Sequence, residues 1–339
     1  MKIISLQFGN KHLERVWKCY EKGESVSPFV YYDYIKYIRR HTAFFSPKYR
    51  IVILCVADEK DEILMIAPLK KEIFGGKYKM LGDLQGCGAT GFIFKPSMSE
   101  SDRELCLDLL FDRIGKRAAI RRVKSNDVIC SYLHGKKLVK SLSKVECVAV
   151  SLPENYDEYI SSLSSSVRQN IRTAYNRLKR DGKSLELKIY RGGQIPDDVR
   201  KEVMKVYIGR LFSKYKKKSG LLLWYYLLKY NYIKHDTKSL FELSNAFHSI
   251  LYIDGKIAAF ANGLQDFQGS QIVVPRLAID INCKFYSPGY LLLCETVKYL
   301  IENTNVRCYD LSRGTEKYKF DLGGKSYWTH SFRLGYGGG

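Results

Sequence analysis

The chain has 339 residues, of which 45% are hydrophobic and 27% charged, a composition typical of a globular protein rather than a disordered chain or coiled coil. The length favours two compact units of about 150 residues each. The formal net charge of +21 points to an anionic partner such as nucleic acid, a phosphorylated cofactor, an acidic polymer or a membrane surface, but it fits a solvated basic surface equally well.

Hydropathy and cysteine usage narrow the class further. No segment approaches the roughly 18 uninterrupted apolar residues that a membrane-spanning helix requires, so we expect no integral membrane segment. The nine cysteines form no C-x-x-C pair, and no histidine stands at a recognisable ligand spacing, so we expect no metal site and no disulfide framework. Free thiols indicate a reducing compartment, and we therefore expect a cytoplasmic protein. The oligomeric state is left open.

The first part of the chain predicts helices and strands in mixed order. Two apolar, β-branched runs separated by an acidic turn predict a hairpin. Apolar residues at the helical period predict a long helix further on. The expected helices are 12–22, 31–40 and 101–118, and the expected strands are 50–57, 63–70 and 125–132.

A domain boundary is expected where the texture of the sequence changes. Residues 145–152 predict a short strand, Pro153 ends it, and a serine-rich helix start follows. We therefore divide the chain into domains 1–147 and 148–339. The second half repeats the order of elements in the first, which is the pattern left by a duplication.

The second half gives clearer signals. The dipeptide Asp254-Gly255 between two apolar runs predicts a hairpin with a type I′ turn. A basic loop, 214–218, is expected between two helices. The expected helices are 166–181, 197–211, 221–234 and 290–301, and the expected strands are 185–191, 247–253, 256–264, 271–279 and 306–311.

The best candidate for a phosphate site lies between the strand 271–279 and the helix 290–301. Here Ser287 can cap the helix, Pro288 suits its first turn, and Gly289 lets a ligand approach the backbone. Unpaired N–H groups and the positive end of the helix dipole favour a bound phosphate. An ordinary capped helix with nothing bound is the alternative.

The helix 166–181 is a second candidate for anion binding. It combines an apolar stripe with a basic one that includes Arg168 and Arg172. Residues 161–220 hold sixteen Lys and Arg against five Asp and Glu. This excess of positive residues accounts for more than half of the net charge of the chain. The stripe can contact cofactor phosphates, an anionic acceptor or nucleic acid, or it can be a solvated face.

Candidate acid–base groups cluster after the last expected strand. In α/β sheets, binding residues gather at the carboxyl ends of strands, and Asp310, Glu316, Tyr318 and Lys319 stand there. Each can equally serve in a structural salt bridge or hydrogen bond. His248, alone at the start of a strand, is expected to be structural, and no Cys–His pairing in the sequence favours a cysteine nucleophile.

Three segments together carry a resemblance to a known family: residues 162–178, Asp280 with residues 285–292, and residues 309–319. They resemble the GNAT-superfamily acetyltransferase domain of the CelD/BcsL type, which is associated with cellulose biosynthesis. The resemblance covers about residues 150–320, and these proteins are similar to the Fem-like aminoacyl transferases. It implies an α/β (α+β) fold of two tandem GNAT-like lobes, each a mixed, mostly antiparallel sheet flanked by helices.

The resemblance also implies a function. It implies transfer of an acetyl group from acetyl-CoA to an amine or hydroxyl of a small acceptor, such as a sugar of a surface polysaccharide. Carried onto this chain, residues 287–289 take the pyrophosphate-loop position, and Asp310, Gly314, Tyr318 and Lys319 match the closing motif. The longer glycine-rich loop of typical GNAT enzymes is missing, because only Gly289 remains between residues 285 and 293.

Two other readings keep the fold and change the activity. A Fem-like transferase would take its acyl group from aminoacyl-tRNA and use the basic residues of 161–220 for phosphate contacts. A catalytically inactive GNAT fold would act as a binding module for nucleic acid or for polysaccharide assembly, since fold does not fix function. Turnover distinguishes the enzymes from the module, and tRNA binding distinguishes the two donors.

Overall fold

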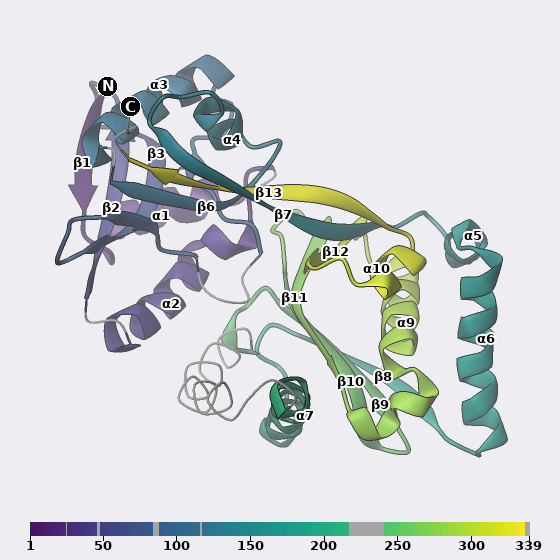
Figure 1. Ribbon diagram of the computed structural model, residues 1–339. Coiled ribbons are helices and arrows are strands. Elements are labelled where there is room, and N and C mark those ends of the chain that lie inside the picture. Colours follow the sequence, from purple (N-terminus) through teal and green to yellow (C-terminus); the bar gives the residue numbers. More distant parts are fainter. Residues whose placement is uncertain (25, 46–47, 84–87, 116, 217–240, 336–339) are drawn as a thin grey trace. The chain divides into compact units, whose positions relative to one another are not determined.

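The computed structural model describes the whole chain except residues 25, 46–47, 84–87, 116, 217–240 and 336–339. The chain forms two compact units (Figure 1). The first contains residues 1–147, 266–268 and 327–339, and the second contains residues 148–265 and 269–326. Strand β7 (Val139–Ser151) carries the chain from the first unit into the second, and β13 (Gly324–Leu334) carries it back.

The first unit is a mixed, mostly antiparallel sheet with helices. Its strand order is β1-β2-β3-β4-β6-β13, with β5 paired to β3. The hairpin of β2 and β3 confirms the expected strand pair. Besides β7 and β13, the elements are β1 (Lys2–Leu6), α1 (Lys11–Tyr20), η1 (Pro28–Val30), α2 (Tyr32–Phe45), β2 (Tyr49–Ala57), β3 (Ile63–Glu72), β4 (Tyr78–Met80), β5 (Ile93–Phe94), α3 (Glu100–Ile114), β6 (Ala118–Lys124) and α4 (Val128–Leu133).

The second unit has the same design. Its strand order is β12-β11-β10-β9-β8, and the end of β7 lies beside β12. The positive φ angles of Asp254 (50°) and Gly255 (71°) confirm the expected primed turn between β9 and β10. The elements are α5 (Tyr156–Ser162), α6 (Ser165–Arg180), β8 (Leu185–Arg191), α7 (Asp197–Lys216), β9 (Ala246–Ile253), β10 (Lys256–Gln265), β11 (Gln271–Ile279), η2 (Ile281–Tyr286), α9 (Pro288–Asn303), β12 (Cys308–Arg313) and α10 (Lys317–Asp321).

Helices cover both faces of the second sheet (Figure 1). On one face, α6 and α9 pack into the larger core, and the apolar stripe expected on α6 is buried: Val167, Ile171, Ala174 and Leu178 are at most 6% exposed. Burial of side chains of this size stabilises the fold by about 1.5–3 kcal/mol for each large one. On the other face, α7 packs over β9, β10 and β11 in a smaller cluster that includes Val203 and Phe260.

In each unit a crossover helix joins a parallel strand pair. In the first unit, β4 pairs with β6 through Tyr78↔Ala118 and Lys79↔Ala119, and α3 lies between them in the chain. In the second unit, β11 pairs with β12 and α9 is the connection. Because parallel strands require such a crossover, α3 and α9 occupy equivalent positions in the two units. The expected fold class of two similar α/β units is therefore confirmed.

Several expected elements differ from the structure. Residues 125–132 do not form a strand: the Asp127 side chain accepts a hydrogen bond from the Ile129 amide and caps helix α4, and the strand of this region is β6, just before it. Residues 214–216 continue α7 instead of forming a basic loop. The expected helix 221–234 lies outside the described residues, as do residues 217–218.

The expected second domain, 148–339, also needs correction at its end. Residues 327–339 belong to the first unit, because β13 pairs with β6 there, with His330 opposite Val123 and Phe332 opposite Ile120. No strand was expected at residues 324–334. Among the helices that the structure describes, none is long and apolar enough to cross a membrane.

Candidate active site

The parallel pair β11–β12 is held together only at its beginning. Its register consists of Gln271↔Cys308, Ile272↔Tyr309 and Val273↔Asp310, although β11 continues to Ile279 and β12 to Arg313. Pairing stops where Pro275, which has no N–H to donate, enters β11. At the same place β11 carries one extra residue relative to β10, a β-bulge that bends a strand. The two strands therefore separate toward the start of α9.

Close packing opposite the bulge explains Gly263 of β10. A Cβ atom on Gly263 would lie 2.4 Å from the Val273 carbonyl oxygen. Glycine lets the two backbones approach, as it does at bulges and other close contacts in sheets. Gly263 and Pro275 thus determine where the bulge forms and where β11 separates from β12.

The turn before α9 has fewer open amides than the sequence analysis expects. Ser287 lies in the left-handed region, with φ 52° and ψ 48°, and its side chain makes no capping hydrogen bond, so the expectation of a serine cap is wrong. The amides of Tyr290 and Leu291 donate to the Ser287 carbonyl oxygen. Pro288 has no N–H, which leaves the Gly289 amide as the one first-turn donor without a hydrogen bond among the described residues.

Two arginines of α6 lie beside this turn. The Arg177 guanidinium donates to the Phe285 carbonyl oxygen at 2.8 Å and stacks on the Phe285 ring at 4.8 Å, and the Arg180 guanidinium lies 5.7 Å from the same ring. The Tyr286 hydroxyl donates to Asp181 at 3.0 Å. These contacts tie the C-terminal end of α6 to η2, next to the start of α9.

The arginines that the sequence analysis selects lie nearer the start of the same helix. Arg168 donates to the carbonyl oxygens of Ser161 (3.1 Å) and Leu163 (2.5 Å), so it caps the end of α5. It stands nine residues before Arg177, about 13 Å along the helix axis. Arg172 is exposed, one turn and a half before Arg177. The structure brings neither Arg168 nor Arg172 to the turn at residues 287–289.

Asp310 lies on β12 at the last pair of the parallel register. Its side chain is buried, and one carboxylate oxygen accepts a hydrogen bond from the Ser312 amide at 2.7 Å. Gln271 Nε2 donates to the other oxygen at 3.4 Å. These contacts hold the carboxylate where the two strands begin to separate.

Lys319 holds the loop that follows β12. Its ammonium group is buried and donates to the carbonyl oxygens of Leu311, Arg313 and Gly314 at 3.0, 2.7 and 3.1 Å. It also lies 3.2 Å from an oxygen of Glu316, whose side chain is exposed. With its protons committed to backbone oxygens, Lys319 shapes the loop and is poorly placed to exchange a proton with substrate.

Tyr318 stands beside Lys319 on α10 and packs against the larger core. Burial raises the pKa of its hydroxyl to about 12, and the Glu316 carboxylate contributes in the same direction. The hydroxyl therefore stays protonated at neutral pH, the form that a proton donor requires.

The sequence analysis considered His248 alone and missed the row of polar side chains that it forms on the α7 face. His248, Asn262 and Arg276 are direct cross-strand partners on β9, β10 and β11, and all three are buried. The Asn262 amide nitrogen lies 2.7 Å from His248 Nδ1. Asp310 faces the same side, since it pairs with Val273. The signal was present in the sequence, because each of these residues interrupts an apolar strand.

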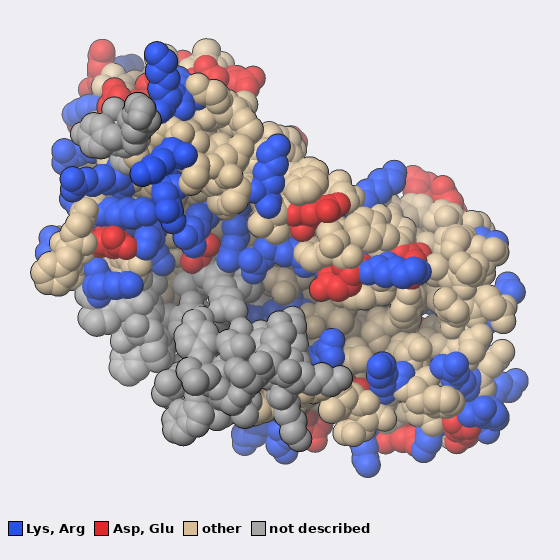
Figure 2. Space-filling view, viewed as in Figure 1, with Lys and Arg blue, Asp and Glu red and all other residues tan. Residues whose placement is uncertain are grey.

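Positive charge is not confined to the second unit. Figure 2 shows Lys and Arg side chains spread over both units on the face in view. In the first unit, a hollow of about 450 Å³ is lined by Lys77, Arg117, Lys140 and Arg333, with Glu72 as its acidic residue. Lys79 binds the Glu72 carboxylate at 2.7 Å. Burial lowers the pKa of Lys77, and the charge of Arg333 acts in the same direction, as expected where cations crowd together.

Comparison with known proteins follows this geometry. Residues 165–320, from α6 to α10, match the model of the acetyltransferase (GNAT) domain family. No curated protein sequence matches the chain. This part of the second unit is therefore similar to acetyltransferase (GNAT) domains.

Solved structures resemble the chain in fold over nearly its whole length. A conserved protein of unknown function from Bacteroides thetaiotaomicron has a TM-score of 0.54 at 13% identity, covering 97% of this chain and 98% of that one. The C-terminal domain of a protein assigned as a lysylphosphatidylglycerol synthetase, from Agrobacterium fabrum, has a TM-score of 0.52 at 13% identity, covering 88% and 92%. FemX has a TM-score of 0.50 at 13% identity, covering 99% and 98%.

Proposed function

We propose that the protein transfers an acetyl or other acyl group from acyl-CoA to an amine or hydroxyl of a small acceptor. The observation that carries this proposal is the parallel pair β11–β12, which parts after Asp310 and leads to the uncapped start of α9. An acyl donor with a diphosphate can lie along this opening, with its phosphates at the helix start and its thioester near Asp310. A sugar of a surface polysaccharide, as in the CelD/BcsL-type proteins, is our proposed acceptor.

The donor site would use the backbone and two cations. The Gly289 amide and the positive end of α9 favour a phosphate oxygen, and Arg177 and Arg180 supply positive charge beside the same turn. Ser287 and Pro288 set the backbone of the turn. Arg168 and Arg172 contribute at most long-range attraction, because of their place on α6.

The reaction needs a proton acceptor and a proton donor. The acceptor nitrogen or oxygen attacks the thioester carbonyl carbon, its proton leaves, and the carbon–sulfur bond breaks to release a thiolate that takes up a proton. Asp310 or Glu316, acting through a water, would take the first proton. Tyr318, which is protonated at neutral pH, would supply the second. Lys319 would keep the loop that follows β12 in place.

Calorimetry and thiol release test this proposal together. Intact protein should bind acetyl-CoA and release free CoA thiol when amines or amino sugars are added. No binding at millimolar acetyl-CoA by folded protein would refute the proposal. Binding with no thiol release over a broad acceptor panel would favour the inactive binding module.

The basic hollow of the first unit favours one alternative, a transferase that takes its acyl group from aminoacyl-tRNA. Four cationic side chains line this hollow, and its acidic residue is already bound by Lys79. Such a hollow suits the phosphates of a nucleic-acid backbone. FemX, which has a similar fold, makes this donor worth testing.

A filter-binding assay separates the two donors. For the alternative, tRNA binding weakens steeply with salt, and the double variant Lys77→Gln/Arg333→Gln lowers the slope of log affinity against log salt by about 2. The double variant Lys137→Gln/Lys325→Gln is the control for loss of charge. If low salt reveals no tRNA binding, the alternative is removed and acyl-CoA remains the donor.

A further inference from the structure

A cysteine and two histidines meet in the first unit. Cys130 Sγ lies 3.1 Å from His330 Nδ1, and His134 Nε2 lies 2.9 Å from the same nitrogen. All three atoms lie within 4.8 Å of one another. Cys130 and His330 are buried, whereas His134 is exposed.

Helix α4 supplies two of these groups. Cys130 lies inside the helix, and His134 is its C-terminal cap, with the His134 amide donating to the Cys130 carbonyl oxygen at 3.1 Å. A spacing of i and i+4 places two side chains on one face of a helix, as in helical metal-binding motifs.

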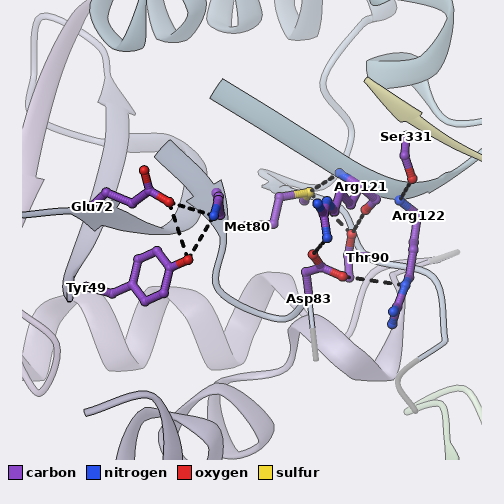
Figure 3. Close-up of polar contacts among 9 residues, drawn as sticks. Tyr49, Glu72, Met80, Asp83, Thr90, Arg121, Arg122 and Ser331 are labelled. Atoms are coloured by element: carbon purple, nitrogen blue, oxygen red, sulfur yellow. Dashed lines mark hydrogen bonds and ion pairs between the residues drawn. The ribbon is translucent and has the colours of Figure 1, made fainter. Parts of the chain in front are cut away.

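Strand β13 supplies the third group, 196 residues later in the chain than His134. A β-bulge in β6 lies next to His330: Arg122 has φ 58°, and its amide donates to Ser331 Oγ at 3.1 Å (Figure 3). Asp83 holds the bulge through Arg121 at 3.3 Å and Arg122 at 3.5 Å. The bulge thus fixes the strand at the residue next to His330.

His330 Nδ1 has two polar partners in this cluster. His330 Nδ1 faces both a thiol and a second imidazole nitrogen, but one ring nitrogen offers either one proton or one lone pair. One of the two short contacts therefore lacks a good donor–acceptor match. A cation between the three atoms would accept a lone pair from each.

The spacing also fits zinc. With Zn–N bonds of about 2.0–2.1 Å and a Zn–S bond of about 2.3 Å, tetrahedral geometry puts two nitrogens about 3.4 Å apart and a nitrogen and sulfur about 3.6 Å apart. The contacts of 2.9 and 3.1 Å need to open by about half an ångström. The third pair, Cys130 Sγ and His134 Nε2, lies within 4.8 Å and has to reach about 3.6 Å.

We propose that Cys130, His134 and His330 form a Zn²⁺ site in the first unit. A thiolate and two imidazoles bind zinc in preference to magnesium or calcium, which favour oxygen ligands. The exposed position of His134 leaves the fourth coordination position open to water. Bound zinc would join α4 to β13 and so fasten the last strand to the first unit.

Cobalt gives a direct test, because it substitutes for zinc and is coloured. Untagged, full-length protein is stripped with a chelator, kept reduced and titrated with Co²⁺. We expect one cobalt per chain, the visible absorption of a tetrahedral site, a thiolate-to-cobalt charge-transfer band, and displacement of both by Zn²⁺. Zinc should also raise the melting temperature and release a proton from Cys130.

Variants decide whether these residues are the ligands. Cys130→Ser should remove the charge-transfer band. His134→Gln, at an exposed position, should weaken zinc binding more than about 100-fold, beyond the cost of losing an outer-shell partner, and the melting temperature of its metal-free form shows whether the fold is kept. Cys19→Ser and His12→Gln, exposed residues of α1, are the matched controls and should change neither. Absence of the band, or unchanged affinity in His134→Gln, would overturn the proposal.

Discussion

The two crossover helices, α3 in the first unit and α9 in the second, begin in opposite electrostatic settings. At the start of α3, Ser99 Oγ accepts a hydrogen bond from the Asp102 amide at 3.1 Å, and Glu100 and Asp102 place negative charge in the first turn. At the start of α9 there is no side-chain cap and no acidic residue. Both helices join a parallel strand pair, so the contrast lies in the sequence and not in the topology.

This contrast is the reason for placing the proposed anionic donor in the second unit. The partial positive charge at a helix start attracts phosphate, but acidic side chains in the first turn cancel that attraction. The start of α3 therefore disfavours a diphosphate, whereas the start of α9 carries no acidic residue and has Arg177 nearby. If the two units arose by duplication, the proposed donor site is present in one copy only.

The largest expected effect comes from the loop that shapes the second unit's site. Lys319→Met removes a buried cation that binds three carbonyl oxygens at 3.1 Å or less, and it should lower the free energy of unfolding by about 4 kcal/mol. Urea unfolding measures this. Lys317→Met is the control: Lys317 is exposed and paired only with Asp321, so its loss should cost less than about 1 kcal/mol. Equal effects would show that Lys319 does not hold the loop.

The first unit should respond to pH through a buried carboxyl group. Burial raises the pKa of Glu21 to about 7, although the Tyr32 amide donates a hydrogen bond to it at 2.6 Å. The pKa of Glu21 is higher in the folded than in the unfolded protein, so the protonated side chain stabilises the fold. This contribution is fully present below about pH 4.5 and is lost as the pH rises through 7. The stability of Glu21→Gln relative to wild type should therefore increase by about 2.5 kcal/mol between pH 5 and 8.

Urea unfolding of both proteins at several pH values measures this gap, and hydrogen exchange should place the change in the first unit. A gap that stays constant with pH would show that Glu21 is ionised in the folded protein.

A smaller effect on free energy, but a clear one on turnover, is expected at the parting strands. Asp310→Asn keeps an oxygen for the Ser312 amide and removes a carboxylate, so thiol release should fall about 100-fold if Asp310, and not Glu316, is the base. Asp102→Asn, at the start of α3 in the other unit, should leave turnover unchanged. Full activity of the Asp310 variant would remove this residue from the proposed chemistry.

The smallest expected effect separates the arginines of α6. Arg177→Gln should raise the dissociation constant for acetyl-CoA about fivefold, about the contribution of one partly screened charge pair. Arg172→Gln, on the same helix and further from the turn, should leave it unchanged. If calorimetry instead shows weaker binding for Arg172→Gln and unchanged binding for Arg177→Gln, the phosphate contact lies at Arg172, which was selected from the sequence.

Local patterns predicted much of the fold. The strands 185–191 and 271–279 and the primed turn at residues 254–255 agree with the structure, because alternation and turn chemistry are contained in a few neighbouring residues. Helix α4 was mistaken for a strand, since a helix of six residues shows hardly more than one period. Strand β13 was not predicted, because its partner β6 lies about two hundred residues earlier in the chain.

The candidate site divides in the same way. Residues 287–289 and 310–319 could be selected from the sequence, since each forms a short local motif. The role of Arg177 could not, because it depends on how the end of α6 packs against η2. Nor could the meeting of Cys130 and His134 with His330, which depends on the return of the chain to the first unit.

Calorimetry of acetyl-CoA with two matched variants tests the central claim most directly. Ser287→Asp adds a negative charge at the start of α9, where aspartate tolerates the left-handed backbone, and Ser101→Asp adds the same charge at the start of α3. Our account predicts that the first variant weakens binding about tenfold and that the second leaves it unchanged. Equal affinities for the wild type and the Ser287 variant would contradict it.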